Sequence, residues 1–287
     1  MGPRGALLAA GAGAGALAAV VWWTAWHEPR RLLVRERELA PPGWPAALDG
    51  LRVGLLSDLH AGLGHMNRAR VARAVTLLND QRPDMVCLLG DFLDSTLFGK
   101  GRADPDAVAG ALAELTAPLG RYAVLGNHDW RAAGAAMRDA LLRAGVPVLE
   151  NDAVEVGQAG RSLWVAGAAD LRTRIPDLRR TLEAVPYGAP VVLMVHNPDL
   201  FPEVPSTVSL TVAGHLHGAQ VDVPGLRLLF IPSSHGTRYL GGLIVEDGRV
   251  LYVSTGLGTA GLPVRFRRPP EVVVLTLRAA RPSDGDR

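Results

Sequence analysis

Short apolar runs alternate with longer amphipathic segments along most of the chain. The runs are four to six residues long, are rich in valine and leucine, and span 51–56, 85–89, 122–125, 163–166, 191–195 and 208–213. Continuous runs of this length predict strands that are buried on both faces. Segments with helical spacing separate the early runs, at 67–80, 106–115 and 132–144. This alternation predicts an α/β fold in which helices cover the sheets.

The C-terminal part of the chain has a different pattern. Strand-like stretches lie close together at 228–231, 243–245, 250–253 and 272–277, and an Asp247-Gly248 pair separates two of them. Asp-Gly pairs favour tight turns, so we expect hairpins that complete a second sheet. The final segment, 279–287, is polar and is expected to be a disordered tail.

Residues 5–26 contain no charged side chain. As a helix this segment would be about 33 Å long, enough to cross a bilayer. Trp22, Trp23 and Trp26 gather at its end, where an aromatic belt would lie at a membrane interface. We therefore expect residues 1–28 to be a single-pass transmembrane anchor in the cell membrane, followed by a basic, Pro-rich linker at 29–48 and the main domain at 49–278.

Two other interpretations of the N-terminal segment stay open. It could be a cleaved secretory signal, although its Trp-rich end does not resemble a cleavage site, or a helix buried in the core. The side of the membrane also stays open. Four arginines follow the segment within 30–37 and only Arg4 precedes it, a bias that favours the cytoplasmic side for the main domain.

Composition narrows the range of partners. The net charge is +2 and no basic stripe is present, so nucleic acid is not expected as a partner. Arg265, Arg267 and Arg268 form a short cluster, which is either a solvated loop or a contact for a phosphate group or an anionic membrane. His65 is expected to be a solvated loop residue, with contact to the substrate as the alternative.

Five of the predicted strands run directly into metal-binding residue types. The strand ends are followed by Asp58 and His60, by Asp91 and Asp94, by Asn127, His128 and Asp129, by His196 and Asn197, and by His215 and His217. The carboxyl ends of strands in an α/β sheet meet at one edge, where ligands bind. Carboxylate oxygens and neutral imidazoles suit manganese, iron and zinc. The sequence therefore predicts one metal-binding site built from these residues.

These blocks, in this order, resemble the calcineurin-like metallophosphoesterases, with Asp-x-His, Gly-Asp-x-x-Asp, Gly-Asn-His-Asp, His and Gly-His-x-His all present. Two later segments, 256–258 and 263–266, are similar to the bacterial membrane-anchored branch of that family. The resemblance implies an α/β fold, a four-layer α/β/β/α sandwich of two mixed sheets, here preceded by the transmembrane helix. It also implies a metal-dependent hydrolase of phosphoester bonds with two divalent metal ions, which can be Mn, Fe or Zn.

The resemblance further implies a role for each matched residue. The implied ligands of one ion are Asp58, His60, Asp91 and His217. The implied ligands of the other ion are Asp91, Asn127, His196 and His215. Metal-bound hydroxide would attack phosphorus. The implied catalytic residues are His128, which would stabilise developing charge or protonate the leaving oxygen, and Asp129, which would orient His128. Asp94 and Asn197 are expected to support the ligands through hydrogen bonds.

Hydrolysis of a phosphoester is the leading hypothesis for function, and the anchor suggests a lipid-linked or envelope phosphate as substrate. A phosphodiesterase acting on soluble or cyclic nucleotides is the alternative, because the same centre performs that chemistry. A non-catalytic metal-binding scaffold is a third hypothesis, against which the complete set of histidines argues. The expected partners are a phosphorylated small-molecule or lipid substrate and, through the N-terminal helix, the membrane. The oligomeric state stays open.

Overall fold

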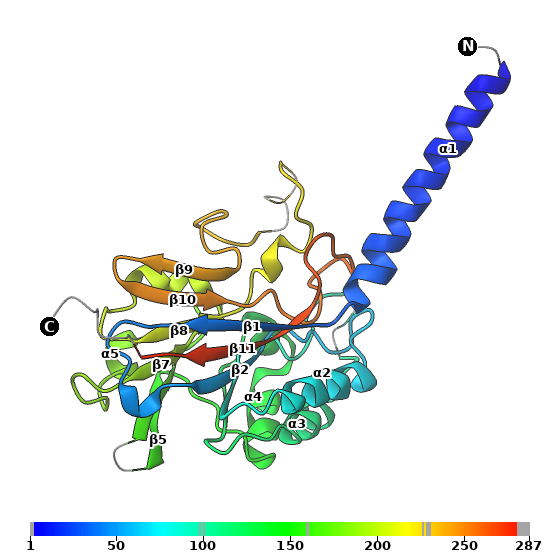
Figure 1. Cartoon of the computed structure of the whole chain (residues 1–287). Coiled ribbons are helices and arrows are strands. Elements are labelled where there is room, and N and C mark those ends of the chain that lie inside the picture. Colours follow the sequence, from blue (N-terminus) through cyan, green and yellow to red (C-terminus); the bar gives the residue numbers. More distant parts are fainter. Residues whose placement is uncertain are drawn as a thin grey trace, which may run out of the picture.

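Two mixed β-sheets lie face to face at the centre of the molecule (Figure 1). The computed structural model describes residues 3–97, 99, 101–158, 161–225, 227 and 231–279. The mixed α/β architecture expected from the sequence is therefore confirmed. The tail predicted at 279–287 lies outside the described residues from residue 280 on, as do residues 228–230 of one predicted strand.

The first sheet joins segments from both ends of the chain. Its strands are, in spatial order, β1 (Leu33–Leu39), β11 (Glu271–Leu277), β2 (Leu51–Leu56), β3 (Met85–Leu88) and β4 (Arg121–Ala123). The strands β2, β3 and β4 are parallel, whereas β11 runs antiparallel to β2 and parallel to β1. The parallel strands therefore end at one edge of the sheet, as their position in the sequence predicts.

The second sheet is parallel in its centre and antiparallel at both edges. Its strands are, in spatial order, β5 (Asp152–Gln158), β6 (Arg161–Gly167), β7 (Val191–Met194), β8 (Leu210–Ala213), β10 (Arg249–Val253) and β9 (Gly242–Glu246). The predicted Asp247-Gly248 turn joins β9 to β10, and both turn residues have positive φ, at 51° and 73°. A turn of that geometry matches the twist of a hairpin.

Alternate residues of β3 face two different apolar cores. Val86 and Leu88 face the helices, whereas Met85 and Cys87 face the second sheet. Because successive side chains of a strand point to opposite faces, a strand between two cores must be apolar throughout. This explains why the segment 85–89 is a continuous apolar run.

Long helices cover only one outer face. The helices α2 (Arg68–Asp80), α3 (Pro105–Ala113) and α4 (Asn127–Arg143) pack on the first sheet. The outer face of the second sheet is covered by the four-residue helix α5 (Leu178–Thr181), by a 3₁₀ segment (Pro198–Glu203) and by loops. The expected outer helical layer on this side is thus built mostly from short segments.

The N-terminal region differs from the predicted division into anchor and linker. The segment 29–48, expected as a linker, contains β1, and all seven residues of β1 pair with β11. The first sheet therefore begins inside the predicted linker and not at residue 49. The apolar pattern did not predict β1 because β1 is an edge strand. Several of its side chains are charged and exposed, so its sequence does not form an apolar run.

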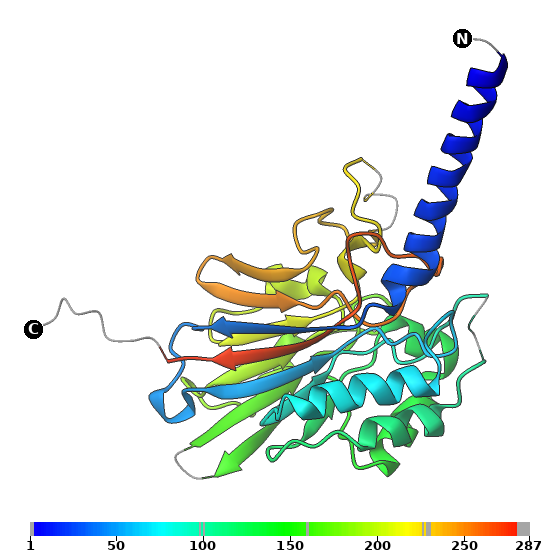
Figure 2. The same cartoon turned by 45° about the vertical axis from the view of Figure 1, so that its right-hand side comes forward.

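The helix α1 (Pro3–Trp22) extends away from both sheets (Figure 2). A π-helical turn (Trp23–His27) joins it to the domain, and the side chains from Gly11 to Val20 are exposed. Within the residues that the structure describes, no helix combines the length and the apolar character that crossing a bilayer requires. The transmembrane helix expected from the sequence is therefore not confirmed.

Candidate metal centre

The predicted ligand residues meet at the carboxyl ends of five strands. They follow β2, β3 and β4 of the first sheet and β7 and β8 of the second. The side chains brought together are Asp58, His60, Asp91, Asn127, His196, His215 and His217, and each is at most 5% exposed. The edge at which the two sheets meet therefore forms one buried site, as the strand ends predict.

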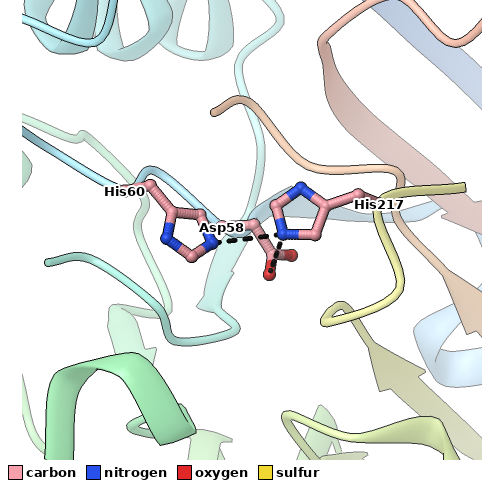
Figure 3. A group of neighbouring side chains, drawn as sticks. All are labelled: Asp58, His60 and His217. Carbon is pink, nitrogen blue, oxygen red and sulfur yellow. Dashed lines mark hydrogen bonds and ion pairs between the residues drawn. The ribbon is translucent and has the colours of Figure 1, made fainter. Parts of the chain in front are cut away.

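The first ligand group consists of Asp58, His60 and His217 (Figure 3). Nε2 of His60 lies 3.1 Å from Nε2 of His217. The Nε2 atom of His217 also lies 3.4 Å from Oδ1 of Asp58. Figure 3 shows the two rings facing one another beside the Asp58 carboxylate. One residue comes from the loop after β8 and two from the loop after β2, so both sheets contribute.

The second ligand group consists of Asp91, His196 and His215. Nε2 of His196 lies 3.2 Å from Oδ2 of Asp91 and 3.2 Å from Nδ1 of His215. The side-chain oxygen of Asn127 faces the same Nδ1 at 3.0 Å. The Oδ2 atom of Asp91 is also 3.6 Å from Nε2 of His60. Asp91 thus lies between the two groups, which is the position that the family resemblance implies for it.

These distances also match those between neighbouring ligand atoms of a metal ion. Metal–ligand bonds of about 2.1 Å in a tetrahedral shell place neighbouring ligand atoms about 3.4 Å apart. The side-chain amide of Asn127 lies 3.0 Å from Nδ1 of His215 and thus belongs to the same group of polar atoms. An amide oxygen at that position and Nδ1 of His215 could both bind one cation, whereas the reversed amide would donate a hydrogen bond to Nδ1.

The charge of the site also suits cations. Asp58, Asp91 and Asp94 are each at most 1% exposed. Among the described residues, the ion-pair partners of these three carboxylates are histidines alone. Buried carboxylates without fixed cations are costly. Divalent ions in the two ligand groups would offset that cost.

The pKa values reflect the same excess of negative charge. Burial alone would lower the pKa of His196, but the charge of Asp91 and a hydrogen bond with it raise that pKa to about 10. Burial opposes ionisation of Asp91, yet the charge of His196 holds its pKa well below the usual range. Burial raises the pKa of Asp58. A site that binds a proton this strongly on His196 is one that favours positive charge at that position.

Five of the ligand residues have left-handed backbones. Their φ angles are 54° at Asp58, 46° at His60, 53° at Asp91, 70° at His215 and 51° at His217. Such conformations cost about 1–2 kcal/mol for each residue that is not glycine. Backbone strain of this kind gathers at functional sites, where the surrounding structure enforces it.

Two glycines leave room for the ligand carboxylates. A Cβ atom at Gly126 would collide with the carboxylate of Asp91, and one at Gly214 would collide with Ser57 and Asp58. The loops after β4 and β8 can therefore approach the ligands only with glycine at these positions.

His128 lies at the edge of the ligand groups, with its side chain 15% exposed. Its Nδ1 accepts hydrogen bonds from the backbone N–H and the hydroxyl of Ser95, at 3.4 and 2.9 Å. Burial lowers the pKa of His128 to about 4, so the ring is neutral at pH 7. With Nδ1 accepting, the proton lies on Nε2. His128 is thus a neutral hydrogen-bond donor rather than a charged acid.

Asp129 was expected to orient His128, but its carboxylate instead binds backbone N–H groups. The two oxygens of Asp129 accept backbone hydrogen bonds from Leu93 at 2.8 Å and from Gly126 at 3.0 Å. Asp129 therefore caps the start of α4, because the first N–H groups of a helix need acceptors. Ser95 is the residue that orients His128, and the sequence offered no motif to identify it.

The other two expected supporting residues have different outcomes. Asp94 places Oδ1 3.3 Å from Nδ1 of His60, as expected of a residue that orients a ligand. Asn197 instead caps the 3₁₀ segment after β7, where its side chain accepts the N–H of Asp199 at 3.0 Å. Asn197 thus supports the loop and not the ligand His196 directly.

Arg265 is fully buried, so neither interpretation of its cluster holds for this residue, whereas Arg267 is exposed. Its side chain donates hydrogen bonds to the carbonyls of Thr255, Gly256, Gly258 and Arg268. Its Nη2 also lies 3.5 Å from Nδ1 of His217. Arg265 thus fixes the loop behind the first ligand group. The carbonyl oxygens of this loop stabilise the buried guanidinium, which the sequence pattern alone did not predict.

His65 is buried as well, at 8% exposure, and so is not a solvated loop residue. Its Nε2 has no hydrogen-bond partner among the described residues. Burial lowers the pKa of His65 to about 3. His65 lies outside both ligand groups and therefore belongs to the packing of the loop after β2.

A pocket of about 480 Å³ adjoins the ligand groups. Its lining includes Asp91, His128, His215 and His217, together with Ile231, Pro232 and residues 260–262. The pocket thus borders on residues of both ligand groups and on His128. A substrate could reach both groups from one side.

Known proteins place this arrangement in context. The family model described as calcineurin-like phosphoesterase matches residues 51–219, a range that includes both ligand groups. The uncharacterized metallophosphoesterase YkuE of Bacillus subtilis is 29% identical over 261 residues, which cover 88% of this chain and 87% of that protein. An uncharacterized metallophosphoesterase of Aquifex aeolicus is 33% identical over 231 residues, or 77% of this chain and 83% of that protein.

A vertebrate relative has a longer chain. The transmembrane protein with metallophosphoesterase domain of Danio rerio is 29% identical over 251 residues, which cover 82% of this chain and 55% of that protein.

Proposed function

The chain belongs to the calcineurin-like phosphoesterase family, and we propose that it hydrolyses a phosphoester substrate at a membrane surface. Membership makes it a metal-dependent phosphoesterase with a dinuclear metal centre. The proposal concerns which residues hold the ions, what His128 does and where the substrate lies.

The two ligand groups would each hold one divalent ion. The residues proposed for one ion are Asp58, His60, Asp91 and His217, and those proposed for the other are Asp91, Asn127, His196 and His215. The observation that carries this assignment is the position of Asp91, whose Oδ2 lies 3.6 Å from His60 and 3.2 Å from His196. When bound, paired ions supply Lewis-acid activation of water and neutralise charge on phosphoryl oxygens.

His128 would donate a hydrogen bond from Nε2 to an oxygen of the phosphoryl group. Ser95 occupies Nδ1, and the ring lines the pocket beside both ligand groups. Negative charge grows on the phosphoryl and leaving oxygens during hydrolysis, so a fixed neutral donor stabilises the transition state more than the ground state. Stabilisation of developing charge is the role that this geometry supports, since the ring is neutral at pH 7.

The proposed membrane location rests on α1. Its described side chains are exposed and apolar, and Trp22 and Trp26 are 54% and 57% exposed at the end near the domain. A helix that is apolar on all sides is stable where lipid or protein surrounds it. The Danio rerio relative is named a transmembrane protein. We propose that α1 associates with lipid and that the substrate is a lipid-linked or envelope phosphoester.

The base of α1 is close to the metal centre. The carbonyl of Thr24 accepts the backbone N–H of Arg265 at 2.8 Å, and the guanidinium of Arg265 reaches His217. A lipid surface around α1 would therefore lie near the mouth of the pocket. This arrangement favours a substrate presented by a membrane over one that diffuses freely.

The test uses the full-length chain in detergent, because β1 makes truncation near residue 39 damaging to the first sheet. Hydrolysis of bis(p-nitrophenyl) phosphate and of p-nitrophenyl phosphate is followed with added Mn²⁺ and with chelator. We expect metal-dependent turnover that His128→Ala lowers by about 10²-fold or more. The exposed Asp139→Asn on the same helix is the matched control and should leave turnover unchanged.

The membrane part of the proposal is tested separately. The full-length chain is mixed with vesicles of neutral and anionic phospholipid and sedimented, and turnover of a vesicle-borne phosphoester is compared with that of a soluble one. Binding to vesicles and faster turnover of the lipid substrate are expected. A chain that stays in the supernatant and prefers soluble or cyclic nucleotides would contradict the membrane proposal while leaving the dinuclear centre intact.

A further inference from the structure

Two exposed leucines belong to loops that border the pocket. Leu262 lines the pocket itself and is 54% exposed. Leu97 follows Thr96, which also lines the pocket, and is 91% exposed. Single exposed leucines are common on soluble proteins and need no explanation. These two differ from such residues in their position, because both lie beside the pocket that adjoins the metal centre.

The loop that carries Leu262 is fixed to the base of α1. The backbone N–H of Arg265 donates to the carbonyl of Thr24 at 2.8 Å. Figure 2 shows this orange-red loop, which lies between β10 and β11 in the chain, beside the base of the helix. The exposed Trp22 and Trp26 lie on either side of Thr24 in the sequence. Exposed apolar residues of α1 and of the pocket therefore belong to segments that are in direct contact.

The loop after β2 joins the two loops that carry the leucines. A Cβ atom at Gly64 would lie 3.2 Å from Cβ of Pro263, in the first of these loops. A Cβ atom at Gly62 would lie 3.1 Å from the carbonyl oxygen of Gly99, in the second. The three loops thus pack against one another. A continuous series of contacts therefore leads from the base of α1 to both leucine loops.

Arginine side chains accompany the apolar ones at the base of α1. The guanidinium carbon of Arg30 lies 3.6 Å from the ring centre of Trp26. Arg31, the next residue, and Arg267, in the loop that contacts Thr24, are exposed. Tryptophan side chains gather where lipid tails meet headgroups, and arginines at that boundary attract anionic lipids. This combination favours a lipid surface over an apolar protein surface as the partner.

We propose that Leu97 and Leu262 insert into an anionic lipid surface, so that the pocket opens directly onto the bilayer. Side chains that leave water in this way bind a membrane through the apolar area that they bury. Arg31 and Arg267 would contact the lipid phosphates. The inference rests on the membrane part of the proposed function, because α1 brings the domain to the bilayer. It goes beyond that part by assigning a lipid-binding surface to the catalytic domain itself.

The test places a polarity-sensitive fluorophore on each loop in turn. The one cysteine of the chain, Cys87, is buried, so Leu97→Cys and Leu262→Cys each add one accessible thiol for an NBD label. The labelled full-length chain is transferred from detergent to vesicles of phosphatidylcholine and phosphatidylglycerol. We expect the NBD emission at both positions to shift to shorter wavelength, and lipids with a nitroxide on the acyl chain to quench it. Vesicles of phosphatidylcholine alone should give a smaller shift, because the arginines then lack anionic partners.

Two further labelled positions serve as controls. Tyr187→Cys is matched in exposure, since Tyr187 is 98% exposed. Tyr187 precedes β7, whereas the ligand His196 follows that strand, so this label lies at the opposite edge of the second sheet and should keep its emission in water. Leu17→Cys, at an exposed position of α1, reports the association of α1 with lipid by itself.

Labels at both leucines that keep their aqueous emission while the Leu17→Cys label responds would overturn the inference and leave the association of α1 intact. A shift that appears without vesicles as protein concentration rises would also overturn it, because a second copy of the chain would then cover these loops. An equal shift on neutral vesicles would contradict the role given to Arg31 and Arg267. If the Leu17→Cys label is silent too, the membrane part of the proposed function fails as well. Turnover of bis(p-nitrophenyl) phosphate by the unlabelled wild type tests phosphoester hydrolysis separately.

Discussion

The four histidines of the metal centre form two pairs. The pairs differ in whether the ring nitrogen that points away from the ligand group faces a hydrogen-bond acceptor. His60 and His196 each have an acceptor there: the carboxylate of Asp94 lies 3.3 Å from Nδ1 of His60, and the carbonyl of Leu89 lies 2.7 Å from Nδ1 of His196. An acceptor behind the ring fixes the tautomer and makes the inner nitrogen a stronger ligand. Burial lowers the pKa of both residues, but the hydrogen bond with Asp94 raises that of His60, and the charge of Asp91 and a hydrogen bond with it raise that of His196.

His215 and His217, from the loop after β8, have no such acceptor. Nε2 of His215 has no hydrogen-bond partner among the described residues, and Nδ1 of His217 faces the guanidinium of Arg265 at 3.5 Å. The pKa of both is lowered well below the usual value, first by burial and then by the charge of the neighbouring histidine.

Each ligand group therefore combines one strong and one weak histidine. His60 is paired with His217, and His196 is paired with His215. The weak members line the pocket, whereas the strong members do not. The comparison teaches that the buried side of the centre is built to retain an ion, while the pocket side leaves the ion free to interact with substrate.

Asp91→Asn should have the largest effect because it removes the atom that both groups share. Removing a residue that only hydrogen-bonds a metal ligand lowers metal affinity or activity by about 10–100-fold. Because Asp91 itself faces both groups, its removal should lower turnover by more than about 100-fold. Mn²⁺ titration should show weakened binding in both groups. If one group keeps its affinity, Asp91 is not shared. Asp139→Asn serves as the control here too.

Asp94→Asn should weaken the first group alone. It replaces the carboxylate behind His60 with an amide, and a loss of about 10–100-fold in affinity for one ion is expected. The second group, whose His196 is held by a backbone carbonyl, should be unchanged. Equal loss of both ions would mean that Asp94 acts on the whole fold of the site rather than on His60.

His60→Ala and His217→Ala sharpen the comparison within one group. If the acceptor behind the ring decides ligand strength, His60→Ala should weaken the first ion at least about tenfold more than His217→Ala, a difference of about 1.4 kcal/mol. Calorimetric titration of Mn²⁺ into the metal-free full-length chain measures both. Equal losses would show that the ring environment does not set ligand strength here.

His65 offers a smaller test, since it has a lowered pKa without belonging to either group. Its folded pKa is about 3 against a usual 6.5, so the unfolded chain takes up a proton first as pH falls. Its contribution to stability is present above pH 6.5 and is lost progressively below it. At pH 5.5 the loss should be about 1.4 kcal/mol.

Chemical denaturation of the wild type and of His65→Gln at pH 7.5 and 5.5 measures how much free energy of unfolding each protein loses between the two pH values. The variant should lose less stability between the two pH values than the wild type does. An identical loss would mean that His65 becomes protonated in the folded chain.

The sequence predicted the metal centre more completely than the framework around it. The gathering of Asp, His and Asn side chains at the strand ends follows from local order, because each buried run leads straight into such a residue, whereas their division between two ions came from the family resemblance. The edge strand β1 was missed, since its exposed charges resemble a linker.

Features that depend on distant contacts could not be predicted. The burial of Arg265 depends on carbonyls of the loop 255–258, which only the folded chain brings to it. The hydrogen bond from the N–H of Leu93 to Asp129 depends in the same way on a distant segment. The left-handed backbones of the ligands follow from how the loops meet and not from residue type.

The most direct test of the account is the number of ions that the full-length chain binds. Metal-free protein would be dialysed against Mn²⁺ and its bound metal measured by elemental analysis beside turnover of bis(p-nitrophenyl) phosphate. The account predicts two ions in each chain and turnover that appears with them. A chain that binds no metal, or that reaches full turnover with a single ion, would contradict it.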